Sequence, residues 1–187
     1  MTLARGSIKG VVLKSRLGFV RDNKGAAGLE SVLARLPAAD RALLDNLLPS
    51  SWYAFEINER LDQAIAREMG QGDAIFTVLG ERSAADNLAA SHRAFVDGQD
   101  PHGLLRHAAS IHQAYYDTGH RTYERTGERS ALLVTHDCAS FSRPECLTNM
   151  GWHRKAIEVC GGRNPRVSDP QCRARGDAVC AYVCEWD

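Results

Sequence analysis

Apolar residues recur every three or four positions through most of the first 118 residues, which is the spacing of amphipathic helices. In the segment 52–69, Leu61 and Ile65 lie four residues apart, and Gly70 follows as glycine often does directly after a helix. Asp100 before Pro101 is a capping side chain followed by proline, which marks a helix start. The predicted helices cover residues 25–36, 52–69, 74–79, 83–88 and 101–117. Pro37 opens a further helix between the first two of these.

Beyond residue 118 the pattern changes to short runs rich in β-branched residues, which indicate strands. A helix at 142–160 interrupts them and ends at Gly161 and Gly162. The predicted strands are 120–126, 130–137, 166–172 and 178–186, with 8–14 as a candidate additional strand. We therefore predict an α+β fold, with N-terminal helices packed on an antiparallel sheet of two hairpins and one helix crossing between them.

The length of 187 residues predicts a single domain, 1–187, with a mainly helical part at 1–118 and the sheet, crossing helix and cysteine-rich hairpin at 119–187. The formal net charge is zero, so nothing in it indicates nucleic acid or an anionic membrane as a partner. No apolar run approaches the ~18–20 residues of a membrane span. The first residues also lack the apolar core of a signal peptide. We therefore expect a cytoplasmic protein with no membrane span.

Five of the six cysteines lie between residues 146 and 184. Cys172 and Cys180 flank the turn at Gly176, and directly opposed residues of a hairpin have Cβ atoms about 4.5–5.5 Å apart. Two such thiolates can close on one metal ion, although a disulfide also fits this geometry. Reduced thiols and a metal are the usual outcome in the cytosol. Cys146, at the start of the preceding helix, is the best candidate for a third ligand, and Asp169 can add an oxygen.

The same stretch resembles the 4-vinyl-reductase-type domain, which also forms the aromatic-sensing module of phenol-responsive transcription activators. The matching positions are Cys146, Gly151, Gly162, Asp169, Cys172 and Cys180. In that family the three cysteines and a glutamate at the position of the acid bind zinc. The resemblance therefore implies a structural zinc on Cys146, Asp169, Cys172 and Cys180. This chain departs from the pattern because the acid is aspartate and Pro170 follows it. The whole chain is similar to a bacterial family of the superfamily that includes haem-NO-binding domains and TRAPP-complex subunits.

The haem-NO-binding domains use a helical histidine, for which His112 is the candidate here, and a Tyr-x-Ser-x-Arg motif that grips the haem propionates. The nearest stretch, 115–118, lacks both the serine and the arginine, so we expect no haem. His136 and Cys138 share one strand face and are candidates for a second metal site or a Cys–His pair. There is no phosphate-binding loop or nucleophile elbow, so we expect no catalytic residues.

These patterns together favour a non-catalytic small-molecule-binding or sensing module stabilised by a structural zinc. By resemblance, a hydrophobic small molecule sits between the helices and the sheet. The candidate pocket residues are Tyr115, Tyr116, His112, Trp152, His153 and Phe95. We expect a homodimer that passes its signal to a partner protein. The alternatives are a scaffold module with a filled or lipid-occupied pocket, a haem-based gas sensor, and a reductase.

Overall fold

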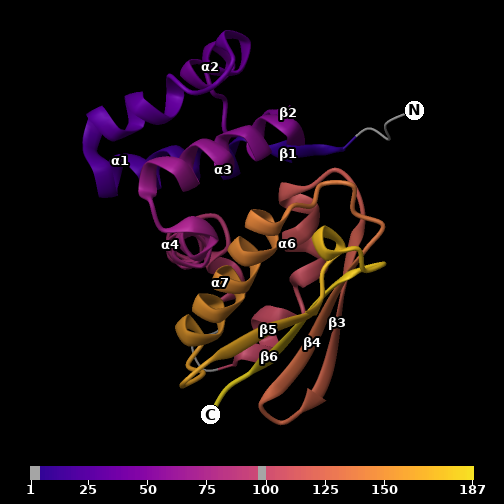
Figure 1. Cartoon of the computed structure of the whole chain (residues 1–187). Helices are drawn as coiled ribbons and strands as arrows, with labels where there is room; N and C mark the ends of the chain where they lie inside the picture. The colour runs from indigo at the N-terminus through magenta and orange to yellow at the C-terminus, as the bar shows by residue number, and fades with distance from the viewer. Residues whose placement is uncertain (1–4, 97–99) are drawn as a thin grey trace.

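The computed structural model describes residues 5–96 and 100–187 (Figure 1). Its strands are β1 (Ser7–Lys9), β2 (Trp52–Ala54), β3 (His120–Gly127), β4 (Ser130–His136), β5 (Arg166–Gln171) and β6 (Cys180–Glu185). Its α-helices are α1 (Gly10–Leu33), α2 (Ala38–Asp45), α3 (Phe55–Met69), α4 (Ile75–Ala89), α5 (Pro101–Leu105), α6 (Ala108–Tyr115) and α7 (Arg143–Val159). Short 3₁₀ turns lie at Gly72–Ala74, Arg93–Phe95 and Arg173–Arg175. None of the described helices is long and apolar enough to cross a membrane.

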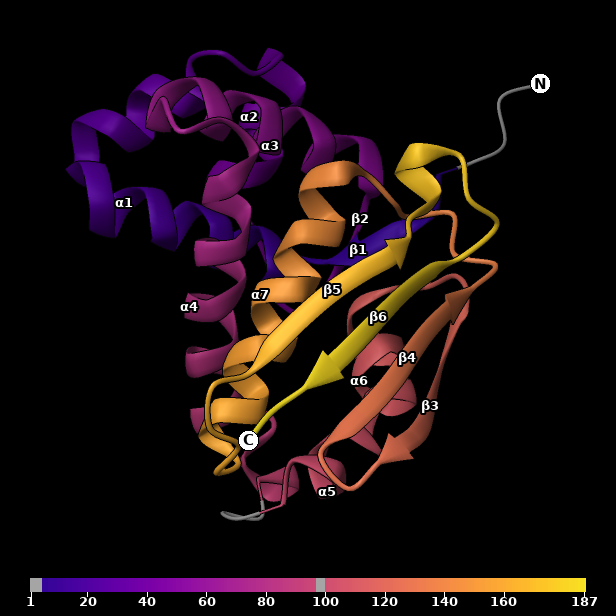
Figure 2. The same ribbon diagram turned by 60° about the horizontal axis from the view of Figure 1, so that its bottom comes forward.

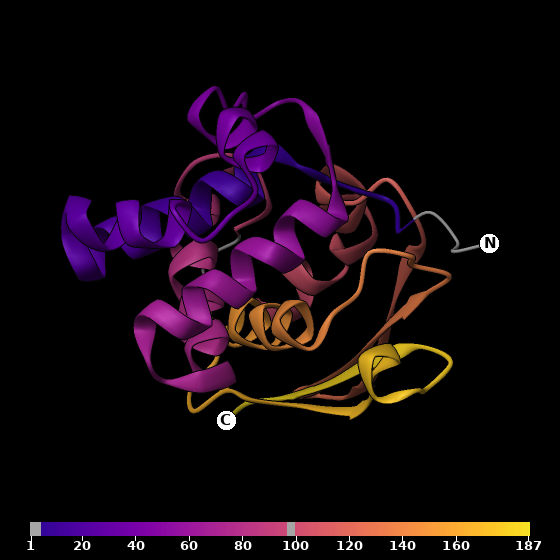
Figure 3. The same cartoon turned by 45° about the horizontal axis from the view of Figure 1, so that its top comes forward.

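Four antiparallel strands form the main sheet in the order β3-β4-β6-β5 (Figure 2). The chain leaves the first hairpin at β4, crosses one face of the sheet as α7, and returns as the second hairpin, whose β6 pairs with β4. Figure 3 shows α7 between this sheet and the layer formed by α1, α3 and α4. The predicted α+β fold, with one helix crossing between two hairpins, is confirmed.

The strand predicted at 8–14 does not join this sheet. Only Ser7–Lys9 is extended, and it pairs with β2 in a separate two-stranded sheet. The helix α1 begins at Gly10, where the amide groups of Gly10 and Val11 donate to the carbonyls of Ser51 and Pro49 at 2.9 Å each. These contacts satisfy N–H groups that a helix start leaves without partners, so tertiary structure overrides the strand preference of the β-branched residues.

Predicted helix boundaries also differ from the structure. The segment expected at 25–36 belongs largely to the longer α1, and the first three residues of the helix expected at 52–69 form β2. The helix expected at 101–117 is divided into α5 and α6, because the His107 amide donates to the Leu104 carbonyl three residues back at 2.9 Å, which tightens the turn. Conversely, the segments expected at 74–79 and 83–88 form one helix, α4. Ser83 does not cap it, since its hydroxyl accepts from the Asn87 amide at 3.3 Å inside the helix.

Helices α4 and α7 cross at two glycines. A Cβ atom added to Gly80 would lie 2.0 Å from the Thr148 carbonyl oxygen, and one added to Gly151 would lie 1.9 Å from the Thr77 carbonyl oxygen. Glycine at both positions lets the two backbones approach closely. This contact fixes α7 against the helical layer, and the same helix carries one side of each candidate site.

A buried charged triad connects the helical layer to α7. The Arg16 guanidinium of α1 lies 2.7 Å from the Asp62 carboxylate of α3 and 2.7 Å from the Glu145 carboxylate of α7. These side chains are at most 4% exposed. Asn58 donates to both carboxylates, at 3.1 and 3.2 Å, and the Tyr116 hydroxyl donates to Glu145. The triad therefore joins three helices through charge-assisted hydrogen bonds.

Candidate functional site

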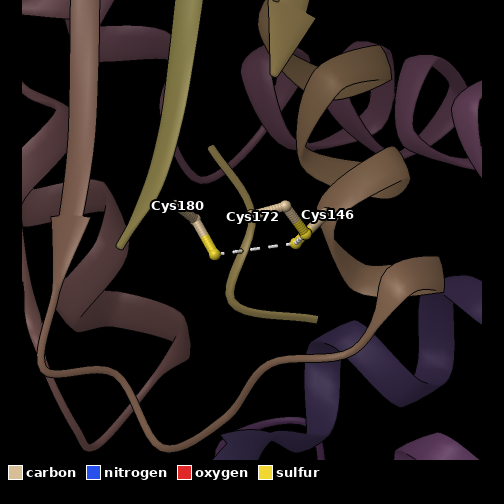
Figure 4. Close-up of side chains that lie close together, drawn as sticks. All are labelled: Cys146, Cys172 and Cys180. Atoms are coloured by element: carbon tan, nitrogen blue, oxygen red, sulfur yellow. Dashed lines mark hydrogen bonds between the residues drawn. The ribbon is translucent and has the colours of Figure 1, made fainter. Parts of the chain in front are cut away.

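Three of the predicted ligands meet where α7 begins and the second hairpin turns (Figure 4). Cys146 lies in the first turn of α7, Cys172 follows β5, and Cys180 opens β6, and all three are buried. The Sγ atom of Cys146 is 3.1 Å from that of Cys172 and 3.7 Å from that of Cys180. All three sulfurs lie within 4.8 Å of one another. Tetrahedral metal–thiolate bonds of ~2.3 Å place sulfurs about 3.8 Å apart, so the cluster has the dimensions of a metal site.

Asp169 is not brought into this group. Its carboxylate accepts hydrogen bonds from Arg143 and from Arg175, the latter at 2.8 Å. The pairing of β5 with β6 shifts register between Ser168 and Gln171, around Pro170. Proline has no N–H to donate to the ladder, and this irregularity leaves Asp169 facing the arginines. Among the described residues, the only group of three or more candidate metal-binding side chains is that of the three cysteines.

Two thiols of the cluster, those of Cys146 and Cys180, differ in pKa. The hydrogen bond from Cys146 lowers the pKa of Cys180 to about 6, and the same contact raises the pKa of Cys146. The Arg173 amide donates to the Cys180 sulfur at 3.4 Å, and the positive charge of Arg121 also lowers this pKa. Cys180 is therefore deprotonated more easily than Cys146, and thiolate is the form that binds metals.

The alternative pair at the end of β4 is separated in the structure. Cys138 is buried, and its sulfur donates to the Ser140 carbonyl at 3.4 Å. His136 instead stacks on His120, its partner across the hairpin, with the ring centroids 4.9 Å apart. The two side chains therefore do not form the metal site or Cys–His pair that their shared strand face indicates.

A cavity of about 40 Å³ lies between α1, α4, α6, α7 and β3, and a second of about 20 Å³ extends from it toward Cys146 and Cys180. Of the six predicted pocket residues, His112, Tyr115, Tyr116 and Trp152 line the larger cavity. Phe95 and His153 are not part of the lining. Phe95 stacks on His107 at 4.3 Å, and His153 contacts Arg121 at 3.2 Å. Sequence reasoning missed the polar lining residues Arg16, Arg121, Glu145 and Asn149.

His112 faces this cavity with one ring nitrogen unused. Its side chain is 2% exposed, and Nε2 lies 3.0 Å from the Thr118 carbonyl oxygen. Since a carbonyl only accepts, Nε2 carries the hydrogen and Nδ1 carries the lone pair. Nδ1 is buried without a hydrogen-bond partner. Burial lowers the pKa of His112 to about 4, so the imidazole is neutral at neutral pH.

Arg121 is the buried position of β3, and it lines both cavities. Its guanidinium donates to Thr135 Oγ1 at 2.9 Å and to Asn149 Oδ1 at 3.1 Å, and it lies over the Tyr182 ring at 5.5 Å. No carboxylate of the described residues forms an ion pair with it within 4.0 Å. A buried cation beside two cavities is therefore held by neutral side chains.

Comparison with known proteins identifies the fold. No protein-family model matches the chain, and no curated protein matches it. The H-NOX protein from K. algicida, in its unliganded Fe(II) form, superposes with a TM-score of 0.74 at 12% identity over 96% of each chain. The S. oneidensis H-NOX protein in the Fe(II)NO state gives a TM-score of 0.74 at 17% identity over 96% of this chain and 99% of that one. A structure from a study of heme distortion in the H-NOX family gives 0.68 at 10% identity, over 96% and 95%.

These structures correct the prediction about cofactors. The prediction of zinc without haem is wrong, because the structures that share this fold are of haem-NO-binding proteins. The Tyr-x-Ser-x-Arg motif covers only five residues, so its absence does not test the fold of the whole chain. The 4-vinyl-reductase label is not confirmed, whereas the wider superfamily with haem-NO-binding domains is compatible with the match. The chain therefore has the fold of the H-NOX proteins.

Proposed function

We propose that this chain is a haem-based gas-sensing module, in which His112 is the residue that holds the haem iron. Two observations support this. The chain has the fold of H-NOX proteins over almost its full length, and His112 presents a buried, neutral imidazole nitrogen without a partner to the cavity. Haem iron held by a histidine supplies a coordination position at which a diatomic gas binds.

The surroundings of His112 suit an iron ligand. A metal-bound histidine usually donates its other N–H to a carbonyl, which fixes the tautomer and the ring orientation. The Thr118 carbonyl accepts this hydrogen bond here, and the Tyr116 ring stacks on the imidazole at 4.8 Å. The cavity of about 40 Å³ is smaller than the ~300 Å³ at which cofactor pockets begin. Binding of haem therefore requires side chains that line the cavity to move outward.

Haem titration tests this function. The purified protein should bind added haem with one-to-one stoichiometry and give a sharp Soret band, and carbon monoxide should shift that band in the reduced protein. His112→Ala should lose the band, and free imidazole should restore it. His107→Ala is the matched control, because His107 lies just before α6 but is exposed, and this variant should behave as wild type. Wild-type protein that gives no Soret band, or His112→Ala that retains a wild-type spectrum, contradicts the proposal.

We also propose that Cys146, Cys172 and Cys180 hold a soft divalent metal ion that joins α7 to the second hairpin. Cobalt(II) added to the reduced, metal-free protein should give an intense thiolate-to-metal charge-transfer band, because three sulfurs of suitable spacing surround one point. Cys172→Ser should lose most of this absorbance and the accompanying rise in thermal stability. Cys138→Ser alters a buried thiol outside the cluster and should retain both. Equal cobalt spectra for Cys172→Ser and Cys138→Ser would contradict a metal site at the three cysteines.

A homodimer, a hydrophobic ligand and a signalling partner protein remain predictions from the sequence. Native mass spectrometry of the purified chain measures the first two directly, because it reports both the mass of the assembly and the mass of any retained molecule.

A further inference from the structure

We infer that Arg121 forms the centre of a binding site for a small carboxylate-type anion within the cavity between α6, α7 and β3. The site does not depend on haem, because the groups that form it are present in the haem-free chain. Three features support it: a buried cation without a carboxylate partner, a buried indole N–H without a partner, and a cavity of matching size.

The buried guanidinium of Arg121 has no carboxylate ion-pair partner among the residues that the structure describes. Burial removes the hydration of a charged group, and an opposite charge nearby normally offsets this loss. Arg121 is 6% exposed, and its three protein hydrogen-bond partners, Thr135, Asn149 and His153, are all neutral. A guanidinium has five N–H groups in a planar fork that matches a carboxylate. These three contacts use three of the five and leave two for a ligand.

Nearby acidic groups already have other partners. Glu145 lines the same cavity, but its oxygens accept from Arg16, Asn58 and the Tyr116 hydroxyl. The Cys180 sulfur also lines the smaller cavity, where its hydrogen-bond partners are Cys146 and the Arg173 amide. Neither Glu145 nor Cys180 forms a hydrogen bond or ion pair with the guanidinium, so its free N–H groups are open to an external anion.

The cavity provides a matching donor on another wall. The indole Nε1 of Trp152 is buried without a partner, and Trp152 lines the larger cavity. The indole nitrogen is a donor only, and it suits one carboxylate oxygen while Arg121 holds the other. Buried polar atoms normally have partners, so an unpartnered donor in the same cavity as this cation indicates a ligand. At ~10–15 Å³ per water molecule, the volume of about 40 Å³ holds roughly three non-hydrogen atoms, which is the size of formate.

Formate titration of the haem-free protein tests the site. Ionic strength is held constant with sodium gluconate, whose anion is too large for the cavity. Formate should raise the thermal midpoint of wild type in a saturable way, by about 5–10 °C when its concentration exceeds the dissociation constant a hundredfold. Arg121→Met should show no shift. Arg125→Met is the control, because Arg125 is an exposed arginine on the same strand, and it should respond as wild type.

Further variants and a second anion source complete the test. Arg121→Lys keeps the charge without the planar fork, so it should bind formate at least tenfold more weakly, and it serves if Arg121→Met does not fold. A carboxylate of haem itself is the other source of the same chemistry. If a haem carboxylate occupies the site, wild type should bind haem at least tenfold more tightly than the dimethyl ester of haem. Arg121→Met should then bind haem and the ester with equal affinity. Absence of a saturable effect of formate and of any ester discrimination in wild type overturns the inference, as does an equal formate shift in all variants.

Discussion

Replacing Arg16 with alanine should lower the free energy of unfolding by about 3–5 kcal/mol at pH 8, because it leaves two buried carboxylates without their shared cation. Asp62 and Glu145 approach Arg16 from two other helices, and all three are buried. Truncation therefore removes one partner of a buried ion cluster and leaves the desolvation of the others uncompensated. Urea denaturation followed by circular dichroism measures the change.

Acid should reduce this loss. Burial raises the pKa of Asp62 to about 6 in the folded protein, above its ordinary value of 3.8. A carboxyl group with a raised folded-state pKa adds stability below the unfolded pKa, and this contribution disappears as the pH rises through the folded pKa. Without Arg16 the folded pKa rises further, so the difference from wild type should shrink between pH 8 and pH 5.

A surface ion pair is the control for Arg16. Arg41 forms an ion pair with Glu30 at 2.7 Å, but both side chains are more than a third exposed. Such pairs contribute ~0–1 kcal/mol, so Arg41→Ala should change stability little and with weak pH dependence. A loss below about 1 kcal/mol for Arg16→Ala at pH 8 would show that the triad does not stabilise the fold.

Gly151→Ala should destabilise the protein by about 3 kcal/mol or more. The added Cβ would lie 1.9 Å from the Thr77 carbonyl oxygen. A backbone atom cannot rotate away as a side chain does, so α4 and α7 must separate. Overpacking in a tight core typically costs ~1–3 kcal/mol, and more where the surroundings cannot yield. Chemical denaturation gives the free energy, and a crystal structure of the variant should show a wider α4–α7 separation.

Gly18 provides the matched substitution. It lies within α1, and a Cβ atom at this position meets no atom within 4 Å apart from the neighbouring backbone of its own helix. Alanine there should stabilise the protein by ~0.5–1 kcal/mol, because glycine in a helix costs more backbone entropy. If Gly151→Ala lowers the free energy of unfolding and Gly18→Ala raises it, the loss at Gly151 arises from the crossing of α4 and α7. Similar small effects at both positions would contradict the close contact.

The second half of the fold follows from local patterns in the sequence. Inward positions of β4 alternate strictly with partly exposed ones, as the strand prediction requires. Ser142 accepts from the Glu145 amide at 3.2 Å and caps α7, whose end at Val159 is followed by the predicted stop. The meeting of three cysteines was predictable because hairpin pairing and a family-like spacing both constrain them.

The polar lining of the cavity was not predictable in this way. Arg121 lies in a strand whose other positions are mostly exposed, so nothing local distinguishes it from a solvated arginine. Arg16 and Glu145 are 129 residues apart, and only the three-dimensional arrangement shows that they form an ion pair. The partners of Asp169 depend on how the strand bends around Pro170, which a regular alternation does not describe. Long-range charge pairing and irregular strands therefore limit what the sequence alone predicts.

The irregular outer strand β5 has a consequence for self-association. An unpaired sheet edge offers backbone groups onto which another chain can add, and this is how many β-proteins aggregate. Pro170 and the register shift interrupt the row of donors along β5. On the opposite edge, exposed charged side chains such as Glu124 and Arg125 line β3. Both edges of the sheet therefore discourage strand-by-strand growth into fibrils.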